Sequence, residues 1–144
     1  MTKKMEREGA GNWRDWFCGL VKRNHTTATT DGARAEALAR EFLEARGLRI
    51  VARNFRVRGG EIDLIAQEGE ILVFVEVRLR RSEQYGGAAA SVTARKRRRI
   101  ILAAQHWRKQ QRQTQAICRF DCVLLDSLEK SAIRWLRHAF TTNS

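Results

Sequence analysis

Three carboxylates lie in a stretch of sequence that otherwise has the composition of buried β-strand. Glu61 and Asp63 stand in "GEIDLIA", and Glu76 follows in "VFVEVRLR", thirteen residues after Asp63. Side chains alternate along a strand, so Glu61 and Asp63 are expected on one face of the first segment. If the two strands pair as a hairpin, the acids of both strands can meet at one end of the sheet.

Carboxylates held within a few ångströms repel one another and raise one another's pKa unless a hard cation takes their oxygens. Magnesium accepts one or two carboxylates and leaves positions for phosphate oxygens, which is chemistry that a phosphodiesterase needs. The alternative is that these acids lie on the polar face of a half-exposed sheet. There they would be neutralised by neighbouring arginines, namely Arg56, Arg58, Arg78 and Arg80.

A second feature is a run of cations without an acid, in "TARKRRRIILAAQHWRKQQRQ", residues 93–113. Charged helix faces usually mix both signs, whereas only one sign is present here. We therefore expect contacts to nucleic-acid phosphates, largely independent of base sequence, and Arg80 and Arg81 would extend this surface. The cations expected to bind within the run are Arg95, Lys96, Arg97, Arg98, Arg99, Arg108 and Lys109.

The net charge also indicates a polyanionic partner. Lys and Arg number 28 against 16 Asp and Glu, which gives a formal charge of +12. Nucleic acid is favoured over an anionic membrane, because no run of about 18 apolar residues could span a bilayer. The N-terminus lacks the apolar core of a secretory signal, so we expect a cytoplasmic protein without membrane contacts.

The cysteines do not suggest a disulfide framework. If Cys118 and Cys122 lie on one strand, four residues separate them by roughly 13 Å, which is beyond disulfide reach. Structural zinc would need more ligands at a recognised spacing than the three cysteines and three histidines offer. We expect reduced cysteines that pack as small hydrophobic side chains.

The length of 144 residues fits a single domain with one hydrophobic core. Residues 1–30 are polar and Thr-rich and predict a flexible basic tail, followed by a nucleic-acid-binding domain over residues 31–142. Within the tail, Trp13, Trp16 and Phe17 have helical spacing and could dock on the domain or on a partner.

The domain is expected to begin with a helix that has Asp31 at its N-cap and Gly47 as its stop. Thr93 can cap a second helix, and Ile100, Ala104 and Trp107 lie on its apolar side. The apolar stripe of the first helix consists of Ala35, Leu38, Ala39, Phe42 and Leu43.

Strands are predicted in "LRIVARNFRVR", "EIDLIA" and "ILVFVEVRL", the last two joined by a turn at Gly69. In the second strand Ile62 and Leu64 are expected on one apolar face. After the second helix, "ICRFDCVLLD" predicts a strand, "SAIRWL" a short strand and "RHAF" a closing turn or helix. The order α-β-β-β-α-β-β predicts an α/β fold with a central mixed sheet flanked by helices.

These motifs resemble the YraN-like uncharacterised family, which is similar to archaeal Holliday-junction resolvases within the PD-(D/E)XK, or restriction-endonuclease-like, superfamily. The likeness covers about residues 31–140. Its marks are Glu36 in the first helix, "GEIDLI", "FVEVR", Lys96, "RFD" at Arg119 to Asp121, and Ala139-Phe140. The resemblance implies a restriction-endonuclease-like core.

The resemblance also implies roles for single residues. Asp63 and Glu76 would bind Mg²⁺ or Mn²⁺, Glu36 would help to position metal or water, and Arg78 would stand where the superfamily has lysine. Arginine stays charged and can only stabilise phosphate charge. Either metal-bound water suffices, or Lys96 supplies the ammonium, or the protein binds without cutting. From the residues alone, Glu36 could instead pair with Arg40.

The sequence thus predicts a metal-dependent endonuclease that acts on DNA, with branched or structured DNA as a candidate substrate and a homodimer as a candidate state. DNA is favoured over RNA as the partner. The alternative is a non-catalytic nucleic-acid-binding protein that keeps the nuclease fold. A third hypothesis is an interaction protein whose tail aromatics dock a partner.

Overall fold

A computed structural model describes residues 30–79 and 92–142 of the chain. The elements follow the predicted order α-β-β-β-α-β-β, which confirms the α/β class. The predictions for the tail aromatics and for Arg80 and Arg81 lie outside these residues. The elements are α2 (Thr30–Ala45), β1 (Arg49–Val57), β2 (Gly60–Glu68), β3 (Ile71–Leu79), α3 (Ala94–Gln110), β4 (Cys118–Leu125), the 3-10 turn η3 (Lys130–Ala132) and β5 (Ile133–Phe140).

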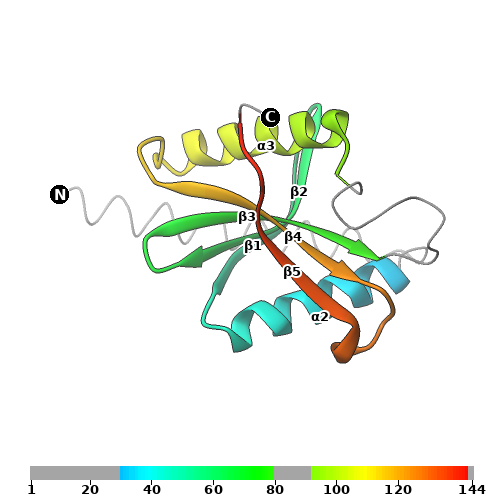
Figure 1. Cartoon of the computed structure of the whole chain (residues 1–144). Coiled ribbons are helices and arrows are strands. Elements are labelled where there is room, and N and C mark those ends of the chain that lie inside the picture. The colour runs from blue at the N-terminus through cyan, green and yellow to red at the C-terminus, as the bar shows by residue number, and fades with distance from the viewer. Residues whose placement is uncertain (1–29, 80–91, 143–144) are drawn as a thin grey trace.

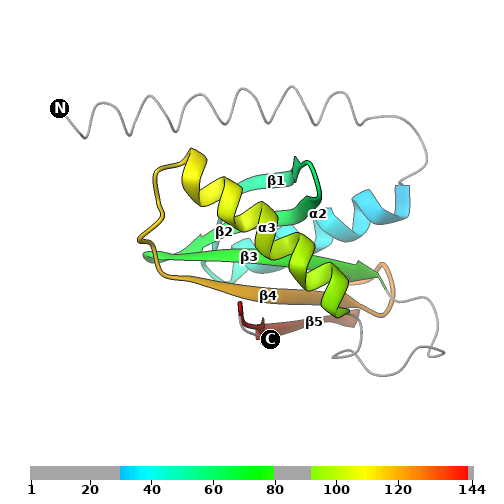
Figure 2. The same ribbon diagram turned by 90° about the horizontal axis from the view of Figure 1, so that it is seen from above.

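The five strands form one mixed sheet in the order β1-β2-β3-β4-β5. Strands β1, β2 and β3 form an antiparallel meander, β4 lies parallel to β3 after the crossover through α3, and β5 returns antiparallel to β4. The two helices cover opposite faces of the sheet (Figures 1 and 2). Neither helix of the described segments is long and apolar enough to cross a membrane.

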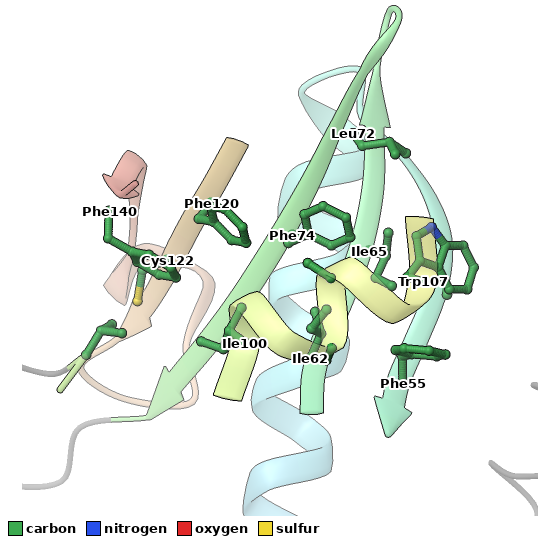
Figure 3. Close-up of a cluster of buried hydrophobic side chains, with 14 of the residues drawn as sticks. Phe55, Ile62, Ile65, Leu72, Phe74, Ile100, Trp107, Phe120, Cys122 and Phe140 are labelled. Carbon is green, nitrogen blue, oxygen red and sulfur yellow. The ribbon is translucent and has the colours of Figure 1, made fainter. Parts of the chain in front are cut away.

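Each face of the sheet carries its own hydrophobic cluster. Helix α2 buries Ala35, Ala39 and Leu43 against the β3 and β4 valines. Helix α3 buries Ile100 and Trp107 on the other face, against a more aromatic set of strand side chains (Figure 3). This arrangement confirms both predicted apolar stripes and holds the two helices in fixed positions over the sheet.

The ends of the helices follow local chemistry. The Thr93 hydroxyl accepts a hydrogen bond from the Lys96 backbone N–H at 3.2 Å, which confirms the predicted N-cap of α3. Gly47, with a φ of 92°, follows the end of α2 as predicted. Asp31 lies in the first turn of α2 and not at its N-cap, because the helix already begins at Thr30.

The prediction that "RHAF" forms a closing turn or helix is wrong. Strand β5 continues through these residues to Phe140, whose ring stacks on Phe120 of β4 with centroids 4.8 Å apart. Burial of this ring extends the strand beyond the short segment that local pattern indicated. Cys118 and Cys122 both lie on β4 and pack in the hydrophobic cluster under α3, as expected.

The alternation of side chains breaks in the middle of β1 and β2. Ile62 belongs to the cluster under α3 and Leu64 to the cluster under α2, so the prediction that they share a face is wrong. Between the Arg53–Leu64 and Phe55–Ile62 pairs lies one rung, occupied by Asn54 and Asp63. Asn54 has a φ of 51°, and this left-handed residue reverses the direction of the side chains beyond it.

Candidate active site

Strands β2 and β3 separate at Asp63. Their ladder ends with the Leu64–Val75 pair, after which β3 continues beside β4 while β2 continues beside β1. At the opening, the backbone N–H of Val77 donates to Asp63 Oδ2 at 2.8 Å. The carboxylate of Asp63 therefore takes the place of a backbone acceptor and is held at the mouth of this opening, which we name the strand fork (Asp63, Glu76 and Val77).

Glu76 is the second acid of the strand fork. It is only 2% exposed, and it lies within hydrogen-bonding reach of Asp63. The Lys96 Nζ is 2.7 Å from Glu76 Oε1. Lys96 comes from the first turns of α3, so the Thr93 cap and the crossover helix deliver an ammonium to a carboxylate on β3. The predicted meeting of Asp63 and Glu76 is confirmed.

Glu36 approaches the same place from α2. Its Oε2 accepts a hydrogen bond from Asn54 Nδ2 at 3.0 Å, and its charge interacts with that of Asp63. Arg40, the partner that the helical spacing offered to Glu36, pairs with Glu44 at 3.7 Å. The side chain of Glu36 is therefore directed to the sheet rather than along its own helix.

Burial and mutual repulsion disfavour negative charge on these acids. Burial, then the nearby Asp63 carboxylate, raises the pKa of Glu76 to about 8, although Lys96 opposes this shift. Burial, then Asp63, raises the pKa of Glu36 to about 7, while the Asn54 hydrogen bond lowers it. Burial also raises the pKa of Asp63, against the Val77 N–H and the charge of Lys96. Additional positive charge would stabilise the ionised form of all three side chains.

The donor set suits a hard cation. Asp63 and Glu76 offer the one or two carboxylates that Mg²⁺ takes when water and phosphate oxygens complete its shell. Within residues 30–79 and 92–142, no three His, Cys, Asp or Glu side chains converge closely enough to hold a metal ion by themselves. A metal here would therefore rely on the two strand-fork acids together with solvent or substrate oxygens.

Arg78 and Glu61 flank the strand fork. Arg78 follows Glu76 by two residues on β3, so alternation places it on the same face, toward α3, where it is half-buried. Glu61 pairs with Arg56 across the β1–β2 ladder at 3.6 Å, with Arg56 exposed and Glu61 half-exposed. This pairing fits a surface acid better than a member of the site.

The cations predicted to bind nucleic acid divide into two groups. Arg97 is half-buried and donates to the Val92 carbonyl at 3.0 Å. Arg108 donates to backbone carbonyls after α3, including that of Ala116 at 3.1 Å, and so fastens the loop before β4. The side chains exposed to solvent are Arg95, Arg98, Arg99 and Lys109.

Arg119 and Asp121 pair with each other on β4, with Arg119 Nε 3.0 Å from Asp121 Oδ1. The buried Asp121 also accepts hydrogen bonds from the Trp135 indole at 2.9 Å and from the His138 backbone at 3.1 Å. Arg119 in turn reaches Glu68 of β2 at 2.6 Å. These contacts join β2, β4 and β5 and give Asp121 a structural role.

Asn54 is the site residue that sequence reasoning missed. Its side chain holds Glu36, and its left-handed backbone lies on the rung it shares with Asp63. A signal was present, because Asn is depleted in strands and is among the few residues that tolerate positive φ. An Asn inside "VARNFRV" could therefore have marked an irregular strand position.

Residues 35–125 match the model of a family described as uncharacterised protein family UPF0102. A UPF0102 protein of Dechloromonas aromatica (strain RCB) is 54% identical over 123 residues, which cover 85% of this chain and 98% of that protein. One from Alkalilimnicola ehrlichii is 51% identical over 111 residues, covering 76% and 86%. The UPF0102 protein YraN of Salmonella arizonae is 48% identical over 111 residues, covering 76% and 82%.

Proposed function

The chain belongs to the uncharacterised protein family UPF0102, and for this member we propose a divalent-metal-dependent phosphodiesterase activity on DNA. The observation that carries the proposal is the strand fork, where Asp63 and Glu76 lie together and the Lys96 ammonium is 2.7 Å from Glu76. Two crowded acids beside a cation, on a chain of net charge +12, match the needs of phosphodiester cleavage.

In this proposal Asp63 and Glu76 hold Mg²⁺ or Mn²⁺, and Glu36 helps to position the metal or a water molecule. When bound, such an ion polarises a phosphate and lowers the pKa of an attacking water. The Val77 N–H and the Asn54 amide fix the Asp63 and Glu36 carboxylates before substrate arrives, which reduces the cost of ordering them during the reaction.

Lys96 supplies the ammonium that β3 lacks. Arg78 stands at the lysine position of the resembled superfamily motif, and arginine there offers a planar, delocalised cation in place of a lysine ammonium. The Lys96 side chain is 31% exposed while it contacts the buried Glu76, so it reaches both the acids and solvent. We assign Lys96 to orienting water or stabilising phosphate charge, and Arg78 to a fixed positive charge beside it.

The test is cleavage of end-labelled duplex, single-stranded, flap and four-way-junction DNA, with an RNA control, in Mg²⁺, Mn²⁺ or EDTA. We expect metal-dependent cutting that Asp63→Ala and Glu76→Ala abolish while binding in EDTA persists, because each change removes only negative charge. Asp126→Ala is the control, since Asp126 is an exposed acid paired with Arg134. Cutting in EDTA, or full activity in Asp63→Ala, would refute the proposal.

A second candidate function is nucleic-acid binding without cleavage. Arg78 favours it, because the residue at that position cannot act as a base. This candidate predicts salt-sensitive binding that is unchanged by metal, and no cutting of any substrate in the panel. Preference for the four-way junction would support a branched substrate, and sedimentation of the protein with that junction would show whether two copies bind together.

A further inference from the structure

The turn between β1 and β2 packs directly on α3 (Figure 1). A Cβ at Gly60 would lie 2.5 Å from the Arg99 carbonyl oxygen and 3.1 Å from the Ala103 backbone nitrogen. A Cβ at Gly59 would meet the Leu102 side chain at 3.2 Å. Glycine at residue 60 is therefore what lets the turn approach the helix backbone so closely.

This contact brings arginines from two elements onto one surface. Arg58, which is exposed, precedes Gly59 in the turn. Arg99, at which Gly60 meets the helix backbone, and Arg95, one helical turn earlier on α3, are also exposed. We name Arg58, Arg95 and Arg99 the turn–helix surface.

Within the described ranges 30–79 and 92–142, the acids nearest in sequence do little to neutralise the turn–helix surface. Helix α3 contains no Asp or Glu from Ala94 to Gln110. The acid that follows the turn on β2, Glu61, is already paired with Arg56 at 3.6 Å. Three exposed arginines therefore share this region of the surface, and an anionic partner would relieve the repulsion among their positive charges.

The turn–helix surface borders the strand fork. Three residues of β2 lead from Gly60 to Asp63, a distance of about 10 Å at the rise of a strand. On the helix side, Arg95 is the residue before Lys96, whose ammonium contacts Glu76. An anion bound to the turn–helix surface would lie beside the two carboxylates.

We propose that the turn–helix surface binds the phosphate backbone of DNA and guides it to the strand fork, with Arg58 and Arg99 as its central contacts. This inference rests on the proposed function and adds the β1–β2 turn to the binding surface.

The experiment measures binding of the full chain to a labelled duplex in EDTA, by anisotropy, over a series of salt concentrations. We expect Arg58→Ala and Arg99→Ala each to weaken binding about fivefold for any duplex sequence, and to reduce the slope of log K against log salt by about one. Arg58→Glu should weaken binding further. Arg134→Ala is the matched control, because Arg134 is an exposed arginine on β5, paired with Asp126.

The outcomes separate this inference from the proposed function. If the wild type cuts DNA but the Arg58 and Arg99 variants bind like Arg134→Ala, the surface is refuted and the phosphodiesterase stands. If those variants lose affinity while the wild type cuts nothing, the surface is supported and only the cleavage proposal fails. A wild type that neither binds nor cuts DNA overturns both.

Discussion

At the scale of single residues, Asn54 both shapes the backbone of β1 and holds one of the acids of the candidate site. Its left-handed conformation reverses the direction of the side chains along the strand at the rung that it shares with Asp63. Its side-chain amide donates a hydrogen bond to Glu36. Asparagine does both because its short polar side chain tolerates positive φ and retains a donor. The two effects can be separated by substitution.

We expect Asn54→Ala to lower the free energy of unfolding by about 1–2 kcal/mol, because a Cβ without a polar group is strained in the left-handed region. Asn54→Gly should cost less, since glycine adopts this φ freely. Both variants lose the hydrogen bond to Glu36, so the cleavage rate should fall in each of them. Urea unfolding and cleavage assays check this, and wild-type cleavage by Asn54→Gly would contradict a positioning role.

Glu36 gives a prediction for pH. Its pKa is raised to about 7 in the folded state, mainly by burial, so the folded chain keeps a proton that the unfolded chain releases near 4.5. The stability linked to this proton is present below pH 4.5 and is lost as pH rises through about 7.

We therefore expect Glu36→Gln to lose less stability than the wild type between pH 5 and pH 8, by on the order of 2 kcal/mol after allowance for partial exposure. Urea unfolding in EDTA at several pH values measures this. Glu41→Gln is the control, because Glu41 is an exposed acid of the same helix. Parallel pH profiles for wild type and Glu36→Gln would show that Glu36 ionises normally.

At the scale of elements, α3 joins several parts of the molecule. Its first turns deliver Lys96 to Glu76, its middle packs on the β1–β2 turn, and Trp107 packs edge-to-face on Phe55 at 5.3 Å. The position of the turn therefore depends on close packing against one helix. A small increase in volume at Gly60 should disturb it.

We expect Gly60→Ala to lower the free energy of unfolding by about 1–3 kcal/mol, because backbone atoms of α3 leave no room for a methyl group. Gly32→Ala is the control. A Cβ there meets nothing within 4 Å, and in helix α2 alanine should stabilise by about 0.5–1 kcal/mol. Thermal unfolding compares the two variants. Equal effects would contradict the close approach of turn and helix.

At the scale of the whole molecule, burial of Asp63 and Glu76 close together lowers the stability of the folded state when both acids are charged. Glu36 approaches the strand fork from one face of the sheet and Lys96 from the other, so elements of both hydrophobic layers meet there. A cation bound to Asp63 and Glu76 would relieve repulsion in the folded state only, since the unfolded chain holds these acids apart. Metal binding and global stability should therefore be linked.

We expect Mn²⁺ to raise the unfolding midpoint of the wild type at pH 8, with about 2.7 kcal/mol gained at a metal concentration 100 times the dissociation constant. Asp63→Asn should lose this gain while keeping a side chain of similar size. Calorimetry with and without EDTA measures the shift. An equal shift in both proteins would place the metal elsewhere.

The sequence alone determined the order of the elements and which strands carry the two acids of the candidate site. Side-chain periodicity indicated both helices and the strands that carry Asp63 and Glu76, and residue type indicated the Thr93 cap. The predicted hairpin between those strands indicated that the two acids meet. These features depend on local spacing and on one short turn. Local spacing records which side chains are buried, and that information is contained in the chain itself.

Only the tertiary structure decided which distant residues share the site. Asn54 reaches Glu36, the β1–β2 turn adds Arg58 to the helix cations, and Arg97 and Arg108 bind backbone carbonyls. The extent of β5 and the opposite faces of Ile62 and Leu64 likewise depend on contacts between strands. Packing and register across the sheet fix these relations, because each depends on residues far apart in the chain that local periodicity does not connect.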